Sequence, residues 1–400
     1  MYHVRLMTPD VAIVGAGPAG ARAAFVLARA GARVTIFDPS HPREKPCGGG
    51  VTGRALSLVA DAIAPGDCPA TVVRSVRFTS GAGARSASVP LPTADALVVV
   101  SRTAFDRALL TAADAAGAAL VPSRVTDVTI ESTGVRLDTT AGVCRADFVI
   151  GADGVNSLVR RRVHTPFGRH QISIATGFFA QGVTSDEIVI ELVPDPPGYI
   201  WSFPRPDHLA IGICAQADAG VTAATLRAQT ARWIHATGIA GQAPLVPYSW
   251  PIPSLGARDF ERLETAGARW ALIGDAAGLV DPMTREGIFF ALSSGQWVAD
   301  ALGGGTNAGR TYASRVLAEA VPELARAARL EAGFFRPAFT DLLMRALQQS
   351  GSIRSVMADL VAGRQSYAGL KSRLLKTFEW RLAARVLLDT LAPPNDVNCP

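Results

Sequence analysis

Charged residues are scarce in this chain, and no long apolar run is free of charge. Asp, Glu, Lys and Arg make up 18% of the 400 residues, against about 25% in ordinary globular domains, whereas 48% are hydrophobic. This composition excludes a disordered chain, which would be rich in charge and poor in apolar residues. Because no stretch of about 18 apolar residues occurs without a charge, we expect no membrane-spanning helix.

Paired cysteines, basic runs and low-complexity segments are also missing. The five cysteines lack Cys-x-x-Cys spacing and the six histidines do not cluster, so we expect no bound metal and a cytoplasmic protein. No run of Lys and Arg is interleaved with aromatic residues, so nucleic acid is not an expected partner despite the net charge of +5. The 38 glycines and 26 prolines stay well below the ~25–30% that is typical of low-complexity sequence.

The first motif that carries chemistry is a glycine-rich turn between two predicted strands. An apolar strand at 11–14 leads into Gly-Ala-Gly-Pro-Ala-Gly, then a helix to residue 30, then a strand that ends in an acid. Glycines let backbone approach a pyrophosphate at the helix start, and the acid can accept hydrogen bonds from a ribose. The alternative is an ordinary tight turn. We predict a dinucleotide site formed by Gly15, Gly17, Ala19, Gly20 and Asp38.

Two further segments each place an acid directly after a predicted buried strand. The strand at 148–151 is followed by Ala-Asp-Gly-Val-Asn-Ser, with the acid at Asp153. The strand at 270–273 is followed by Gly-Asp-Ala-Ala-Gly, with the acid at Asp275, and then by Asp-Pro-Met-Thr-Arg-Glu-Gly and a predicted helix. Only the first motif is a complete fingerprint, so we expect no separate domain for a nicotinamide nucleotide.

These three motifs, in this order, resemble FAD-dependent flavoproteins of the p-hydroxybenzoate hydroxylase type over most of residues 11–300. The resemblance implies an α/β fold with a Rossmann-like FAD-binding domain, an antiparallel β-sheet substrate domain and a helical C-terminal region. It implies that Asp275 binds the ribityl chain, and that the N–H groups of Gly287 and Ile288 face the flavin ring at a helix start. It also implies FAD contacts by Arg102, Val125, Asp153 and Pro282. For Arg102 and Val125, a surface salt bridge or plain core packing are the alternatives.

The domain boundaries follow from the positions of the motifs and from the pattern between them. Alternating and β-branched runs between the cofactor segments predict an antiparallel sheet that roofs a substrate cavity. The FAD-binding domain is then discontinuous, and the expected ranges are 1–70, 101–165 and 266–310 for this domain, 71–100 and 166–265 for the substrate domain, and 311–400 for the helical region.

Other segments resemble the geranylgeranyl reductase branch, whose members saturate isoprenoid double bonds. They are Lys-Pro-Cys-Gly-Gly-Gly at 45–50, Pro-Gly-Tyr-Ile-Trp-Ser-Phe-Pro at 197–204 and the stretch 363–371. On a strand, Tyr199, Trp201 and Phe203 share one face, which suits an apolar isoprenoid-like substrate; ordinary sheet packing is the alternative. The resemblance implies that Cys47 and Gly48 lie near the flavin, although an inert buried thiol is also a common fate of cysteine.

The predicted function is therefore an FAD-dependent reductase that saturates C=C bonds of an isoprenoid or similar apolar substrate. Hydride from reduced FAD would reach one alkene carbon, and a proton from Cys47 or Tyr199 the other. The external reductant would be NAD(P)H or a ferredoxin-type donor. One alternative is a flavin-dependent monooxygenase acting on an apolar or aromatic metabolite, and another is a non-catalytic FAD-binding maturation partner.

Two features need the structure to interpret them. The family usually has Gly-Glu-Gly where this chain has Arg285, Glu286 and Gly287. Three alternatives are open for the Arg285 side chain: it stabilises an anionic flavin, it raises the flavin's redox potential, or it points to solvent. The stretch 364–385 has basic residues with leucines at helical spacing between them. It predicts an amphipathic helix that either packs on the protein body or lies on an anionic membrane surface, as a peripheral contact.

Overall fold

The three nucleotide-binding motifs follow three strands of one parallel sheet. The computed structural model describes residues 9–64, 66–305 and 307–377, and its first sheet has the order β18-β12-β1-β2-β8. All neighbouring strands in it are parallel, so the motifs meet at one edge, where α/β sheets bind ligands. The strands are β1 (Asp10–Val14), β2 (Arg33–Phe37), β8 (Ala119–Val121), β12 (Phe148–Gly151) and β18 (Trp270–Leu272).

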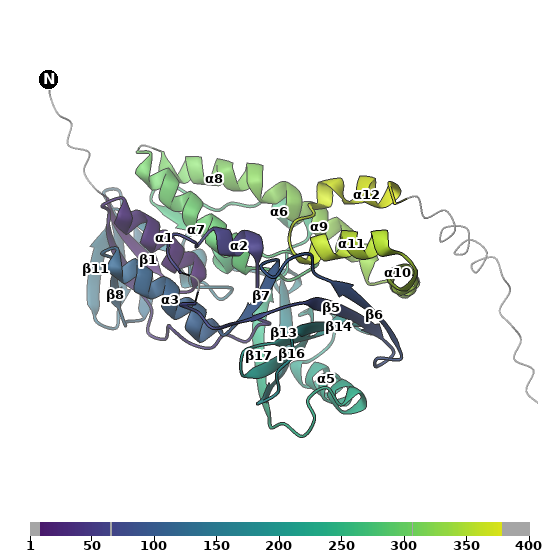
Figure 1. The fold of residues 1–400 in the computed structure, drawn as a ribbon. Helices are drawn as coiled ribbons and strands as arrows, with labels where there is room; N and C mark the ends of the chain where they lie inside the picture. The colour runs from purple at the N-terminus through teal and green to yellow at the C-terminus, as the bar shows by residue number, and fades with distance from the viewer. Residues whose placement is uncertain (1–8, 65, 306, 378–400) are drawn as a thin grey trace, which may run out of the picture.

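Helices and a small antiparallel sheet complete the core around these strands. Helix α1 packs against both α3 and α7, as the ribbon shows (Figure 1). Strand β1 is buried from Val11 to Val14, which explains its continuous apolar sequence. The elements are α1 (Pro18–Arg29), α3 (Arg102–Ala115), α7 (Ile288–Gly303), β9 (Val125–Ile130), β10 (Val135–Thr139) and β11 (Gly142–Ala146).

The second sheet has seven strands in the order β17-β13-β16-β15-β14-β5-β6. Its neighbours are antiparallel, as predicted, except that β14 pairs with β5 in parallel. No hairpin joins these two strands, which are far apart in the sequence, so either direction is open to them. The strands are β5 (Ser75–Ser80), β6 (Arg85–Pro90), β13 (Ile172–Gln181), β14 (Glu187–Pro194), β15 (Pro197–Pro204), β16 (His208–Gln216) and β17 (Leu245–Pro253).

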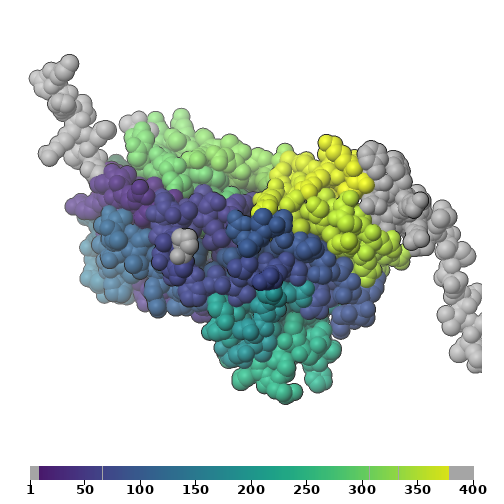
Figure 2. Space-filling model, viewed as in Figure 1, coloured from purple at the N-terminus to yellow at the C-terminus, as the bar shows by residue number. Residues whose placement is uncertain are grey.

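Helices cover this second sheet as well. Helix α5 (Ala223–Thr237) packs on β13 and β16, whereas α10 and α11 pack on β6. In the space-filling view the yellow C-terminal helices meet the dark blue surface of the β5–β6 segment directly (Figure 2). The C-terminal helices are α8 (Ala308–Glu319), α9 (Val321–Phe334), α10 (Pro337–Gln349), α11 (Gly351–Val361) and α12 (Tyr367–Leu375). The shorter elements are β3 (Gly50–Thr52), β4 (Ala70–Val72), β7 (Leu97–Val100), α2 (Gly53–Ser57), α4 (Leu158–Val163) and α6 (Ala257–Glu261).

The predicted fold class is confirmed: a parallel Rossmann-like sheet, a largely antiparallel second sheet and a helical C-terminal part. None of the helices in the described part of the chain has both the length and the apolar character that crossing a membrane requires. The basic helix predicted over 364–385 is described only in part, as α12, because the residues from 378 onward lie outside the described ones.

Candidate active site

A single cavity of about 890 Å³ joins the edge of the parallel sheet to the second sheet. Its polar end is formed by the three nucleotide-binding motifs, and its other end by apolar side chains of β5, β14 and β15 and of the C-terminal helices. The volume lies in the range of about 300–1,000 Å³ that is common for small-molecule sites. Of the predicted site residues, those that line it are Gly15, Gly17, Ala19, Asp38, Cys47, Gly48, Arg102, Val125, Asp153, Tyr199, Trp201, Phe203, Asp275, Gly287 and Ile288.

The glycine turn leaves the start of α1 open toward the cavity. Gly15 has a φ of +104°, and a Cβ there would clash with the carbonyl of Ala152. Gly20 does not line the cavity; a Cβ on it would strike the carbonyl of Gly15, so this glycine permits close packing of helix and strand. Gly17 caps α1 without a side-chain acceptor for the first N–H groups. This helix start fits a pyrophosphate, which such free N–H groups bind.

Asp38 is saturated by donors from its own loop and from the glycine turn. Its carboxylate accepts hydrogen bonds from the backbone N–H groups of Ala16 and Ser40, at 3.0 and 2.8 Å, and lies 2.7 Å from Nδ1 of His41. Burial alone would raise the pKa of Asp38, but the hydrogen bond and charge of His41 and these N–H donors lower it well below its usual value. The carboxylate thus fixes the loop, and its predicted ribose contact stays a prediction. His41 has no motif around it that could have revealed this role.

Arg102 forms a buried ion pair and is not the surface residue that was one alternative. It is 3% exposed, and its Nε and Nη2 each lie 2.9 Å from an oxygen of Asp106. Burial by itself would lower the pKa of the Arg102 guanidinium, but Asp106 and the neighbouring Cys47 outweigh this and raise the pKa above its usual value. Asp106 also lies 3.5 Å from Nε2 of His41, so the ion pair continues into the Asp38 loop.

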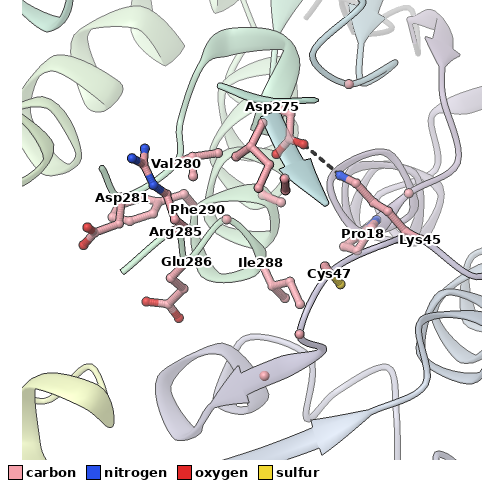
Figure 3. Close-up of a pocket in the computed structure, with 18 of the residues that line it drawn as sticks. Pro18, Lys45, Cys47, Asp275, Val280, Asp281, Arg285, Glu286, Ile288 and Phe290 are labelled. Carbon is pink, nitrogen blue, oxygen red and sulfur yellow. Dashed lines mark hydrogen bonds and ion pairs between the residues drawn. The ribbon is translucent and has the colours of Figure 1, made fainter. Parts of the chain in front are cut away.

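The acids of the second and third motifs have different surroundings. Asp153 accepts hydrogen bonds from Ser157 and from the N–H of Leu158 at 2.6 Å, so it caps the start of α4. Burial raises the pKa of Asp153. Asp275 is paired with Lys45, whose Nζ lies 2.8 Å away and reaches across from the loop that also carries Cys47 (Figure 3). Lys45 stands in the 45–50 motif, but its sequence position alone does not indicate an acid partner.

In the segment before α7, the structure places Pro282 outside the cavity lining and removes one of the three alternatives for Arg285. Gly287 is the N-cap of α7, again without a side-chain cap, and lines the cavity with Ile288. Pro282 does not line the cavity, although Asp281 and Met283 on either side of it do. Arg285 does not point to solvent: its side chain is 12% exposed, donates to Ser254 and lies 3.6 Å from Glu331.

A buried arginine that sequence reasoning missed holds the loop at 45–50. Arg205 is fully buried and pairs with Glu44. Its Nη2 donates to the carbonyl of Cys47 at 2.6 Å, and its Nε lies 3.4 Å from the carbonyl of Gly48. The Cys47 sulfur lies 3.8 Å from Arg102 and 3.7 Å from Arg205, between two guanidinium groups. Arginine at a strand end carries no sequence signal for such a role.

Tyr199, Trp201 and Phe203 line the same cavity, as their period-two spacing predicts. The ring of Phe203 lies against the loop, and a Cβ on Gly48 or Gly50 would come within 2.9 Å of it. The two glycines therefore allow this contact. Tyr199 donates from its hydroxyl to the carbonyl of Thr284 at 3.0 Å, and burial raises its pKa. Whether these rings contact a substrate stays a prediction.

Comparison with known proteins identifies the family of the chain. The family model described as an FAD binding domain matches residues 8–302. A menaquinone reductase of Mycolicibacterium smegmatis is 32% identical over 74% of this chain and 76% of its own length. A digeranylgeranylglycerophospholipid reductase of Methanothrix thermoacetophila is 30% identical over 86% and 92%, respectively. A geranylgeranyl bacteriochlorophyll reductase-like structure from Thermoplasma acidophilum has a TM-score of 0.76 at 23% identity and covers 92% of this chain and 99% of that one.

The chain therefore belongs to the FAD-binding domain family, and it is an FAD-dependent oxidoreductase that resembles geranylgeranyl reductases. The open helix starts at Gly17 and Gly287 and the close packing of Gly15 and Gly20 fit this cofactor.

We expect Asp38→Asn to lower the free energy of unfolding by about 2 kcal/mol at pH 7, because the variant cannot hold a charge against His41. The pKa of Asp38 is lower in the folded protein than in the unfolded chain. The ionised carboxylate therefore stabilises the fold at pH values above the unfolded pKa, near 3.9, and this stabilisation is lost as the pH falls through the folded pKa. Urea unfolding between pH 2 and 7 measures this difference. The exposed Asp218→Asn serves as control, and a difference that does not shrink in acid would contradict the prediction.

Replacing Arg205 by Met should lower the free energy of unfolding by about 2–4 kcal/mol, because the carbonyls of Cys47 and Gly48 and the carboxylate of Glu44 lose their donor. The freed loop should also let iodoacetamide label Cys47 several-fold faster, as peptide mass mapping can measure. The matched control is the exposed Arg310→Met. Unchanged stability together with unchanged labelling would show that Arg205 does not hold the loop.

Proposed function

We propose that this protein reduces C=C bonds of an isoprenoid or similar apolar substrate with hydride from reduced FAD. The observation that carries the proposal is the continuity of the cavity, which links the nucleotide-binding motifs to an apolar chamber. The names of two relatives, a menaquinone reductase and a digeranylgeranylglycerophospholipid reductase, support it. When bound, FAD supplies the hydride; the protein supplies binding, orientation and a proton.

The motif residues would hold FAD along the polar end of the cavity. Gly15, Gly17 and Ala19 stand where the pyrophosphate would meet the start of α1, and Val125 lines the cavity on β9. Asp275, with Lys45, stands where the ribityl chain would run. The N–H groups of Gly287 and Ile288 would face the flavin ring at the start of α7, where the helix dipole favours negative charge.

The apolar end would hold the prenyl chain and exclude water. The second sheet contributes Tyr199, Trp201 and Phe203, and its other apolar lining residues are Val76, Phe78, Ile188, Ile190 and Leu192. Helices α9 and α11 and the residue that follows α9 close the chamber with Phe334, Phe335, Met357, Leu360 and Val361. Burying such a chain is favourable by roughly 25 cal/mol per Å² of apolar surface. Cys47 and Tyr199 are the proton donors that we propose at this end.

The test begins with anaerobic reduction of the bound flavin by NADH, by NADPH or by a reduced ferredoxin in parallel, which also identifies the donor. A panel of prenylated quinones, diphosphates and lipids is then added, and we expect flavin reoxidation with products heavier by two hydrogen atoms in mass spectrometry. Reoxidation that requires oxygen and yields hydroxylated products would instead support the monooxygenase. Tight association with a client protein and no turnover would support the maturation partner.

Ile190→Trp should raise KM for the reduced prenyl compound at least 10-fold, or about 1.4 kcal/mol, because the larger ring fills the apolar chamber. The affinity for FAD should stay unchanged, as fluorescence titration can measure. Val246→Trp places the same side chain on an exposed position of β17 and serves as control. Equal KM values in the two variants would argue against this chamber as the substrate site.

We also propose that the described part of the basic C-terminal helix contacts an anionic membrane. Leu375 is 70% exposed beside Lys371 and Lys376, a combination that suits lipid headgroups. Because each such charge contributes about 1 kcal/mol, reversing both lysines to Glu removes about 2 kcal/mol of attraction and adds repulsion, so it should weaken co-sedimentation with phosphatidylserine vesicles by at least about 30-fold at low salt. The control reverses the exposed Arg107 and Arg310. Equal vesicle binding by both double variants would contradict a role for α12.

A further inference from the structure

A second cavity of about 160 Å³ lies behind Tyr199. Its lining includes Cys214, Gln216 and Glu331, which do not line the main cavity. Tyr199, Arg285 and Phe335 line both cavities and therefore form the partition between them. The volume is sufficient for several water molecules, and the polar side chains supply hydrogen-bond partners for them. The second cavity thus brings a few polar side chains, Gln216, Arg285 and Glu331, up to the wall of the main cavity.

The backbone at Arg285 directs its guanidinium into this partition. Its φ of +60° is in the left-handed region, which residues with a Cβ rarely adopt outside functional or tightly constrained sites. The side chain extends away from Asp275 and Cys47 (Figure 3), donates to Ser254 and lies 3.6 Å from Glu331. The cation therefore stands between the two cavities and pairs with Glu331 on the side of the second one.

Glu331 brings a carboxyl group to the second cavity from helix α9. Its side chain is 32% exposed, so the carboxyl is in reach of solvent while it also faces Arg285, Tyr199 and Cys214. Burial raises the pKa of Glu331, and the charge of Arg285 only partly opposes this. The carboxyl consequently keeps its proton to a higher pH than an ordinary glutamate does.

The hydroxyl of Tyr199 is the group that connects the two cavities. It donates to the carbonyl of Thr284, in the main cavity, and it is within electrostatic range of Arg285 and Glu331 in the second. A proton given by Tyr199 to a substrate must be replaced, and the rings of Trp201 and Phe335 that pack against Tyr199 have no acidic proton to give. The second cavity offers a separate path for that replacement.

We propose that the second cavity is the proton supply of the reduction, with Glu331 as the acid that reprotonates Tyr199. This inference rests on the proposed function. As hydride from reduced FAD forms a C–H bond at one alkene carbon, the O–H bond of Tyr199 breaks and its proton forms the C–H bond at the other. The tyrosinate recovers a proton from the Glu331 carboxyl through water in the second cavity, and solvent reprotonates the carboxylate. The net change is addition of one hydride and one proton to the alkene.

The kinetic test uses the FAD-loaded protein and the best prenyl substrate of the panel. Glu331→Gln keeps the shape and can still accept from Arg285, but it holds no acidic proton; we expect substrate-dependent flavin reoxidation to slow about 10- to 100-fold, with FAD affinity unchanged. The wild-type rate should fall as the pH rises through the titration of Glu331, whereas the rate of the variant should not. Glu331→Asp should restore most of the rate, and the exposed Glu319→Gln should change nothing.

A second readout needs neither FAD nor substrate. A carboxyl with a raised folded pKa adds stability that is present below the unfolded pKa, near 4.3, and is lost as the pH rises through the folded pKa. As the pH rises from 4 to 8, the urea midpoint of the wild-type apoprotein should therefore decrease relative to that of Glu331→Gln. A relative midpoint that stays constant or rises would overturn the role of Glu331 as the acid.

The outcomes separate the two proposals. If the wild type reduces no alkene in the panel, the proposed function fails and the relay fails with it. If the wild type reduces an alkene and Glu331→Gln matches its rate and pH profile, the relay alone is overturned. If Glu331→Gln does not fold, the pH profile of Glu331→Asp tests the relay instead. A profile with the same pH dependence as the wild type but a much lower rate would indicate that Glu331 has a structural role, and would overturn the relay.

Discussion

The buried guanidinium of Arg205 holds the two halves of the site in register. It belongs to the chain just after β15, on the second sheet, yet it donates to the backbone of the Cys47 loop beside the nucleotide-binding sheet. Its partner Glu44 also accepts from Ser101 and Thr103 at the start of α3, so one ion pair joins a helix, a loop and a strand end. A fully buried charge is tolerated only when it is paired and hydrogen-bonded, and the loop carbonyls meet that requirement here.

The same logic applies to the acids of the polar end. Asp38, Asp106 and Asp153 are each saturated by arginine, histidine or backbone donors. Their first effect is to fix the loops and helix starts around the cavity, so little reorganisation is required when a ligand binds. The free binding capacity lies instead in backbone N–H groups at the starts of α1 and α7, which no side chain caps.

The apolar end is built by different means and serves a different need. Strands β5, β14 and β15 supply one wall, and C-terminal helices packed on the β5–β6 segment supply the other. Such walls would suit the proposed prenyl chain, and a reduction beside them would need a controlled proton path. The partition of Tyr199, Arg285 and Phe335 is the point where polar and apolar spaces come closest.

The sequence by itself determined the nucleotide-binding strands, the glycine turn and the shared face of Tyr199, Trp201 and Phe203, because each depends on local spacing. The likeness of three ordered motifs was enough to predict the cofactor and the fold class. Only the tertiary structure decided the parallel pairing of β5 with β14, the burial of Arg285 against Glu331 and the roles of Arg205, Lys45 and His41. Each of these depends on contacts between segments or side chains that no local sequence pattern encodes. The sequence around an arginine does not indicate whether its guanidinium will be solvated or paired with a buried carboxylate.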